Sequence, residues 1–557
     1  AAPGPVGGQL FDYGTDCTGE DIDNGVCPMV DGVGHGTHVT GTAAGDGSAT
    51  GRGQPAWRFP GGAPDADLVV VKGGDAAYTA DRLVDGVAYI FARAEALGRP
   101  AVVNVSLSSQ AGPHDGTTLL EQALDALSGP GRIVVTGSGN AGDHRNTEPV
   151  VPNGPYHVQG SAGQGRHAVR IRGYRPRPGA VNDGLILELW YDGSDSLAVT
   201  VRTPRGDAVT VATGDSATLS TDGGTATLMN AVDGPSPLNG DHAALIGIVD
   251  ELEALPPDSG RWEIQVDPVA LNAGGTYHLW LAGVILDSDV PPGLEGGVSN
   301  RYLVGVPATA DRVLSAGAHV TRHEWLGVDG TPNTFFFREP MGSIAYFSSA
   351  GPRRDGVLKP DLTAPGKVVI SSLSRNATLW EDYPELVESD SVHVGLLGTS
   401  MAAPQLTAAV AVLLLLVPEL TPVEARDLLR AGGRRDAATG GGLPNAVWGA
   451  GKLDAAASAE RLRPEGLAGS GEAVTLSSNP IRGDALVISY AEPPRSMAVY
   501  TVIAERVRSF SGPEIGPLTT VWPLDTDAGG AVANGVYVLV VELDGDRVVR
   551  KILVARP

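Results

Sequence analysis

Two patterns of hydrophobic and polar residues alternate along the chain. In the first, short apolar runs are separated by longer amphipathic segments, which is typical of buried parallel strands connected by helices. This pattern fills about 30–150 and returns near residue 300. The expected elements are strands at 67–72, 100–106, 132–136 and 313–318, and helices at 79–97, 117–127, 421–429 and from just after Ser400. A parallel sheet flanked by helices is therefore predicted.

In the second pattern, apolar and polar residues alternate over short runs, and turn residues such as Asp192-Gly193 separate the runs. Runs of this kind predict strands with one buried face, stacked as a β-sandwich. The pattern fills about 155–285 and returns after a linker rich in Pro, Gly and Ser at 463–471.

The order of the two patterns predicts an α/β domain interrupted by a β-sandwich. The expected units are the two parts of the α/β domain at 1–152 and 291–462, an inserted sandwich at 153–290, the linker, and a smaller C-terminal sandwich at 472–557. A length of 557 residues agrees with several domains, because a single core seldom serves more than about 300 residues.

Composition narrows the class of protein. Acidic residues exceed basic ones by 64 to 40, which argues against nucleic acid as a partner because phosphate binding needs clustered Lys and Arg. The longest apolar run, 408–417, is shorter than the roughly 20 residues that cross a bilayer, so no membrane span is expected. Cys17 and Cys27 are the only cysteines; they could close one short loop, as in a secreted protein, or remain unpaired.

Three short motifs could carry chemistry. In the first, Gly34-His35-Gly36-Thr37-His38, small residues surround an imidazole that could act as a general base near neutral pH. A His pair at this spacing could equally hold a metal or make structural hydrogen bonds.

The second motif, Gly398-Thr399-Ser400-Met401-Ala402, places a serine at the start of an apolar helix. There the unpaired backbone N–H groups favour developing negative charge, although an ordinary helix cap is the commoner role of such a serine. In the third, the strand at 132–136 leads into Gly137-Ser138-Gly139-Asn140, where an Asn amide could donate to an oxyanion or simply form a turn.

Together, and in this chain order, the three motifs resemble the subtilisin-like serine proteases, the subtilase family. Further family-like segments are Val103-Asn104-Val105-Ser106-Leu107, Tyr346-Phe347-Ser348-Ser349-Ala350-Gly351-Pro352 and Lys359-Pro360-Asp361-Leu362-Thr363-Ala364-Pro365-Gly366. The resemblance implies a subtilisin-like α/β fold and a serine endopeptidase that cuts polypeptides through an acyl-enzyme, with no cofactor required for the chemistry.

The resemblance also implies roles for individual residues. Ser400 would be the nucleophile and His35 the general base, and Asn140 with the Ser400 backbone N–H would form the oxyanion hole. An extended substrate would pair with Ser106, Leu107 and Ser108, which with Gly137, Ser138 and Gly139 would wall the primary specificity pocket. Neither wall contains a charged residue, so a neutral or apolar side chain is favoured before the scissile bond.

The carboxylate that should orient the imidazole has no obvious position in the sequence. The family places it before the His, at the end of an apolar strand, and no such strand precedes His35. Asp12 is a poor match, and Asp31 stands at a different acidic position of the family. The segments 13–22 and 112–117 resemble the Csp-like branch of subtilases, which also carries an inserted jelly-roll-like domain. We therefore expect the first strand and the triad Asp to lie upstream of Ala1.

The remaining expectations concern location and ligands. The C-terminal segment is similar to Ig-like modules of secreted bacterial proteins, including domains that address a secretion machinery, although a generic sandwich fits equally well. A secreted or cell-surface bacterial protein is thus expected. Structural calcium agrees with the resemblance and the acidic surplus, but no loop allows its ligands to be assigned. The alternative to an active protease is a catalytically impaired subtilase fold that serves as a surface or adhesion protein.

Overall fold

The structure is a computed structural model. It describes the residues 13–74, 78–144, 156–250, 255–335, 337–462, 474–477, 481, 485–490, 492–501, 505–544 and 547–554.

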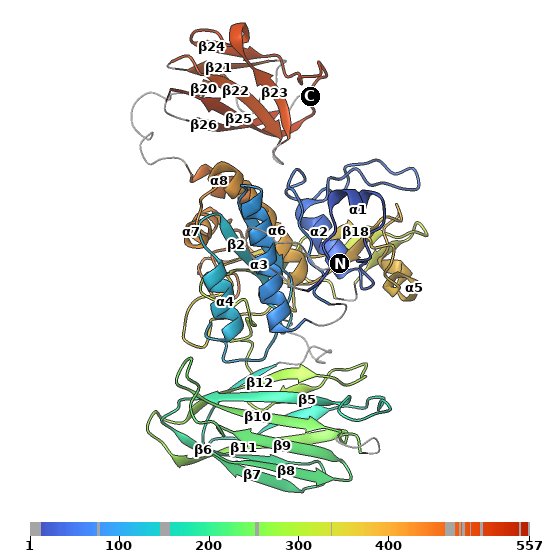
Figure 1. The fold of residues 1–557 in the computed structure, drawn as a ribbon, viewed down its shortest axis with the longest axis vertical. Coiled ribbons are helices and arrows are strands. Elements are labelled where there is room, and N and C mark those ends of the chain that lie inside the picture. Colours follow the sequence, from blue (N-terminus) through green and yellow to red (C-terminus); the bar gives the residue numbers. More distant parts are fainter. Residues whose placement is uncertain are drawn as a thin grey trace.

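A four-stranded parallel sheet forms the centre of the α/β domain (Figure 1). Its strands, in spatial order, are β1 (Ala101–Val105), β2 (Arg132–Gly137), β14 (Leu314–Val320) and β17 (Leu362–Lys367). Side chains alternate between the two faces of β2: Ile133 and Val135 join the core under α6 (Thr399–Leu416), while Val134 joins the core under α3 (Ala80–Ala96) and α4 (Leu119–Leu127). Helices therefore cover both faces, as the predicted fold class requires.

The other elements of this domain surround the sheet. They are α1 (Gly19–Asp23), α2 (His35–Ala44), β15 (Glu324–Leu326), β16 (Pro332–Thr334), β18 (Val369–Ser372), α5 (Leu379–Asp382), η1 (Pro384–Leu386), β19 (His393–Leu396), α7 (Pro422–Gly432) and α8 (Ala455–Glu460). The hairpin of β18 and β19 packs beside α2, and the long connection between its two strands carries α5 and η1.

The strand predicted at 67–72 is wrong. This segment forms no strand, and Leu68 and Val70 are 55% and 65% exposed. No described strand pairs with this segment, and β1 is an edge strand that pairs with β2 alone among the described residues, so the backbone of 67–72 has no ladder of hydrogen bonds. An apolar run alone indicates that a strand is favourable, whereas the strand itself needs a partner edge.

The inserted region forms a two-layer β-sandwich. One sheet has the order β3 (His157–Ser161), β12 (Thr276–Val284), β5 (Gly184–Tyr191), β10 (His242–Val249), β9 (Gly224–Asn230), β8 (Ser216–Thr221). The other has the order β13 (Gly293–Glu295), β4 (His167–Ile171), β11 (Gly260–Ala270), β6 (Ser196–Arg202), β7 (Ala208–Ala212). Buried residues from both sheets form one core between them. The predicted domain boundaries and the jelly-roll description stay predictions.

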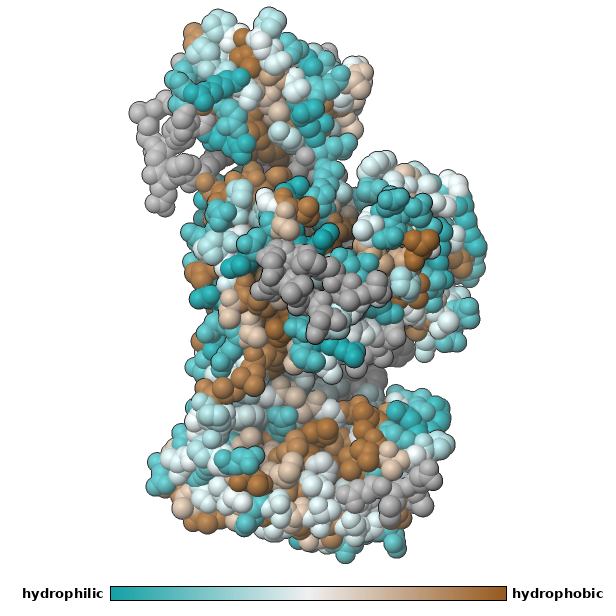
Figure 2. Space-filling model, in the orientation of Figure 1, coloured by the Kyte–Doolittle hydropathy of each residue, from teal (hydrophilic) through white to brown (hydrophobic). Residues whose placement is uncertain are grey.

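Apolar residues also lie on the outer side of this sandwich. Figure 2 shows hydrophobic residues gathered over β5 and β10, and Ile186 of β5 and Met229 of β9 are 39% and 41% exposed. Alternation along the strands places these side chains opposite the core.

Polar contacts attach the sandwich to the α/β domain through the segment 112–117. The Gly112 N–H donates to the Glu188 carboxylate of β5 at 2.7 Å. Arg354 forms ion pairs with Asp115 of this segment and with Asp241, which precedes β10. One of the two segments that resembled the Csp-like branch, 112–117, therefore lies at the contact with the insertion.

The C-terminal sandwich has a core of its own. Its strands are β20 (Val474–Leu476), β21 (Leu486–Tyr490), β22 (Ser496–Thr501), β23 (Arg506–Phe510), β24 (Thr519–Trp522), β25 (Gly535–Glu542) and β26 (Arg547–Val554), with the short helix η2 (Gly512–Glu514). They form sheets of the order β20-β21-β24 and β23-β22-β25-β26, and Trp522 is fully buried between them.

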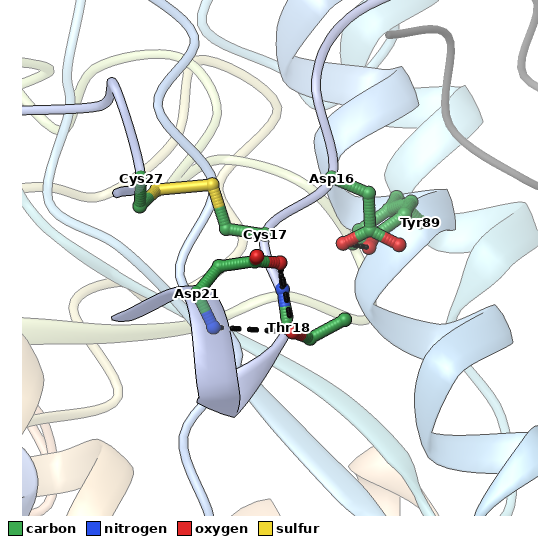
Figure 3. Close-up of a disulfide and its surroundings, with 6 residues drawn as sticks. All are labelled: Asp16, Cys17, Thr18, Asp21, Cys27 and Tyr89. Atoms are coloured by element: carbon green, nitrogen blue, oxygen red, sulfur yellow. Dashed lines mark hydrogen bonds between the residues drawn. A yellow bond between two sulfur atoms is a disulfide. The ribbon is translucent and has the colours of Figure 1, made fainter. Parts of the chain in front are cut away.

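A disulfide joins Cys17 and Cys27 near the described N-terminus (Figure 3). The loop that it closes contains α1, whose N-terminus is capped by Thr18 and Asp21 in reciprocal hydrogen bonds. The preceding Asp16 accepts a hydrogen bond from Tyr89 of α3 at 2.7 Å. Of the two alternatives for the cysteines, the structure therefore has the closed loop, held against the face of α3.

One described helix, α6, is long and apolar enough to cross a membrane by length and composition alone. In the structure 67% of it is buried inside the protein, where it contacts all four strands of the parallel sheet. The apolar sequence of α6 is therefore explained by its position in the core of the protein.

Candidate active site

Ser400 is the second residue of α6. The helix begins with Gly398 at its N-cap, where φ is +146° and a side chain would be strained. Pro404 lies one turn later and has no N–H, so the Ser400 carbonyl cannot receive its usual helical hydrogen bond. The Ser106 hydroxyl donates to this carbonyl instead, at 2.8 Å. The Ser400 hydroxyl in turn donates to the Ser106 carbonyl at 3.3 Å, so two hydrogen bonds tie the serine to the segment after β1.

Asn140 follows β2 and faces the start of α6. Its Oδ1 accepts hydrogen bonds from the Thr399 N–H at 2.9 Å and from the Thr399 hydroxyl at 3.0 Å. Because a backbone N–H can only donate, these bonds identify the oxygen of the amide and leave Nδ2 free to donate elsewhere. A methyl group on Gly398 would lie 3.5 Å from that Nδ2 and 3.6 Å from the backbone nitrogen of Ser400. Two nitrogen atoms that can donate hydrogen bonds thus border one small space.

His35 is the first residue of α2. The preceding Gly34 has φ +87°, and any side chain there would collide with the Trp380 ring, which lies 2.6 Å from the position of a Cβ. Asp31 caps the helix, accepting from the N–H groups of Gly34 and Thr37 at 2.7 Å each. Burial lowers the pKa of His35, and the nearby Asp31 carboxylate offsets part of this effect. The imidazole is therefore neutral at neutral pH and able to accept a proton.

The three residues line one cavity of about 310 Å³. The rest of its wall is apolar and consists of Val33, Leu379, Trp380, Leu396, Leu397 and Met401. Sequence reasoning missed Leu379 and Trp380, which belong to α5. Their only signal was a pair of adjacent apolar residues in the long connection between two short strands.

The six residues predicted to wall a specificity pocket lie close together but outside this cavity. Ser106, Leu107 and Ser108 continue beyond β1 without pairing as a strand, and Gly137, Ser138 and Gly139 end β2 and follow it. A side chain on Gly139, whose φ is +108°, would come within 2.9 Å of the Ser108 hydroxyl. The two predicted walls are therefore in contact at this point, and their substrate-binding role stays a prediction.

The predicted acid of the triad is not among the described residues. Asp12 lies outside them, and within the part of the chain that the structure describes no carboxylate lies within hydrogen-bond distance of His35. Asp16 bonds to Tyr89, and Asp31 acts as a helix cap.

The second histidine of the first motif has a structural position. His38 is fully buried, and its Nε2 lies 3.2 Å from each of the carbonyl oxygens of Val369 and Val394, on the β18–β19 hairpin. No group of three or more His, Cys, Asp or Glu side chains in the described ranges could hold a metal ion. Structural calcium stays a prediction without assigned ligands.

Comparison with protein families decides the class. The family model described as "Subtilase family" matches residues 21–175 and 274–451, which is more than half of the chain. The chain belongs to the subtilase family. The unmatched residues between the two segments include most of the inserted β-sandwich.

Individual subtilases resemble shorter stretches. Serine protease AprX of Bacillus subtilis is 30% identical over 179 residues, which is 32% of this chain and 36% of AprX. A subtilisin of Bacillus sp. strain TA39 is 29% identical over 197 residues, which is 31% of this chain and 44% of that subtilisin. The chain therefore spans less than half the length of these two relatives.

Among solved structures, the CspB protease of Clostridium perfringens is similar to most of the molecule. The TM-score is 0.60 with 23% sequence identity, and the match covers 78% of this chain and 82% of that one. At this identity the likeness supports the fold, and it extends beyond the residues matched by the family model.

Proposed function

We propose that this subtilase is a secreted serine endopeptidase in which Ser400 attacks the scissile carbonyl and His35 acts as general base. The observation that supports the proposal is the cavity shared by Ser400, His35 and Asn140, at the N-termini of two helices. Helix N-termini favour negative charge, which develops on the carbonyl oxygen during acyl transfer.

In the proposed mechanism, the Ser400 hydroxyl first turns from the Ser106 carbonyl toward His35 and gives the imidazole its proton. The tetrahedral oxyanion then receives hydrogen bonds from Asn140 Nδ2 and the Ser400 backbone N–H. His35 next protonates the leaving amine, and the acyl-enzyme is hydrolysed by water activated in the same way. A carboxylate that orients His35 is part of this proposal, and Asp12 or a residue upstream of Ala1 would supply it.

Several further features belong to the same proposal. Secretion is supported by the disulfide, since such bonds persist in oxidising compartments. The substrate would be an extended polypeptide paired along Ser106, Leu107 and Ser108. The C-terminal sandwich would serve contact with a secretion machinery, and structural calcium would be an accessory to stability.

Labelling of the full-length protein with a fluorophosphonate probe tests this proposal. We expect covalent labelling of the wild type, no labelling of Ser400→Ala, and unchanged labelling of Ser216→Ala, which changes an exposed serine of the inserted sandwich. A denatured protein would then be incubated with the wild type as substrate. Mass spectrometry of the products would show whether peptide bonds within its chain are cut. Absence of label on the wild type would overturn the protease proposal and leave a non-catalytic subtilase fold.

A further inference from the structure

The cavity at the proposed active site is lined by residues other than those expected to bind substrate before the scissile bond. Its lining includes Met401, which follows the serine, and Leu396 and Leu397, which precede Gly398. None of the six residues of the predicted specificity walls contributes to it. Ser106, which belongs to those walls, makes its hydrogen bonds to Ser400 from outside the cavity. The cavity is therefore distinct from the predicted pocket for the residue before the scissile bond.

The position of His35 indicates which half of a substrate this cavity would receive. In serine proteases the imidazole gives its proton to the leaving amine, so the leaving half must lie next to the imidazole. His35 lines the cavity together with α5. The part of the substrate that leaves with the new amino terminus would therefore lie over this cavity.

The wall opposite Ser400 is held firmly in place. The Trp380 indole N–H donates to the Ser374 carbonyl at 3.0 Å, and the Ser374 hydroxyl donates to the Asp31 carbonyl at 2.7 Å. Trp380 is 9% exposed, and its ring packs against Gly34. These contacts fix an apolar wall relative to His35, which is what a specificity pocket needs.

The chemistry of the wall defines what it would accept. Apart from the three proposed catalytic residues, all six lining residues are apolar. A buried carboxylate or ammonium would find no charged partner there and would lose its hydration, whereas an apolar side chain would gain by leaving water. A volume of about 310 Å³ is enough for one large side chain.

We infer that α5 forms a pocket for a large apolar side chain on the residue that follows the scissile bond, with Trp380 and Leu379 as the residues that determine this preference. The inference rests on the proposed function and adds a substrate class to it: polypeptides cut before residues such as Leu or Phe.

Partition of the acyl-enzyme measures this pocket directly. A peptide ester acylates Ser400, and an added amino-acid amide then competes with water. The α-amino nitrogen of the amino-acid amide forms a bond to the acyl carbon, the bond between this carbon and Ser400 Oγ breaks, and the amine proton passes through His35 to Oγ. The ratio of aminolysis to hydrolysis depends on how well the amide fits the leaving-group side, and it is independent of the amount of active enzyme.

For the wild type we expect leucinamide to be at least tenfold more effective than aspartic acid amide, since hydrophobic pockets discriminate by about 10–200-fold. Leu379→Arg should reduce this preference for leucinamide over aspartic acid amide about tenfold or more, because it adds a charge to the wall. The matched control is Tyr383→Arg, which adds the same charge to the same connection at a residue that is 50% exposed and does not line the cavity.

Each outcome has a defined meaning. Equal aminolysis by the two amides in the wild type would overturn the proposed apolar pocket. An unchanged preference for leucinamide in Leu379→Arg would overturn it as well. In either case fluorophosphonate labelling of Ser400 would show that the protease proposal still stands. If the wild type is not labelled, the proposed function fails, and this inference fails with it.

Discussion

The two sides of the proposed active site are held in different ways. On the Ser400 side, the end of β2 and the start of α6 are joined through Asn140 and Thr399, and α6 is packed on all four strands of the sheet. On the His35 side, α2 packs on α6 and β18 and is capped by Asp31, which belongs to a loop. The neighbouring segment 67–72 forms no strand.

Because the two sides are held by different contacts, substitutions on each side should affect different steps of the proposed reaction. Changes on the Ser400 side should alter transition-state stabilisation directly, because Asn140 Nδ2 and the Ser400 backbone nitrogen border one space. Changes on the His35 side should act through the position of α2 and the pKa of the imidazole.

The largest effect should come from Ser400→Ala. Loss of the nucleophile costs on the order of 10⁶ in kcat in a subtilisin, and we expect a fall of similar size here. The measurement is kcat for an internally quenched peptide. A variant that kept more than a hundredth of the activity would break the assignment of the nucleophile.

Asn140→Ala should have the next largest effect. Removal of one oxyanion donor lowers kcat by about 10²–10³ with little change in KM. Thr399→Val serves as the control, because it removes the hydroxyl bond to Oδ1 and keeps the backbone N–H bond. We expect it to lower kcat by about tenfold or less. Equal losses in both variants would mean that Asn140 acts only by holding α6.

Removal of the disulfide tests the stability of the segment that precedes His35 in the chain. A loop with ends ten residues apart contributes about 3 kcal/mol in the chain-entropy model, so Cys17→Ser with Cys27→Ser should lower Tm. Calorimetry of wild type and variant, with and without reductant, checks this. Reductant should lower Tm only in the wild type; an equal response in both would contradict a structural role for the bond.

The smallest effect should come from Asp31→Asn. Asn keeps one of the two oxygens that accept backbone N–H bonds at the start of α2, so the helix should persist with a weaker cap, but the charge that favours protonated His35 is lost. His35 must be neutral to accept a proton, so the labelling rate should rise with pH through its pKa, below 6.5 in the wild type. In the variant this rise should move to lower pH. A shift to higher pH would contradict the stated effect of Asp31.

Much of this picture could be predicted from local sequence. The apolar runs at 100–106 and 132–136 correspond to β1 and β2, and the predicted subtilisin-like fold class is confirmed. The motifs around His35, Asn140 and Ser400 predicted one shared site through their resemblance to the subtilases, and the three residues line one cavity in the structure.

Other features depend on contacts that no local pattern contains. The run at 67–72 is as apolar as β2, yet whether it forms a strand depends on pairing with a neighbouring strand. Trp380 approaches His35 only because Gly34 leaves room for the ring. Pro404 likewise depends on a distant contact. It leaves the Ser400 carbonyl without its helical hydrogen bond, and Ser106, far away in the sequence, donates to this carbonyl instead.

The link between Ser106 and Ser400 spans 294 positions of the chain, with the whole inserted sandwich between them. Contacts of such separation form slowly and late, after the intervening region has been synthesised and has folded. A nascent chain would therefore carry His35 and Asn140 long before it acquired Ser400. Under the proposed function, the order of synthesis would keep the unfinished protein from cutting its neighbours on the ribosome.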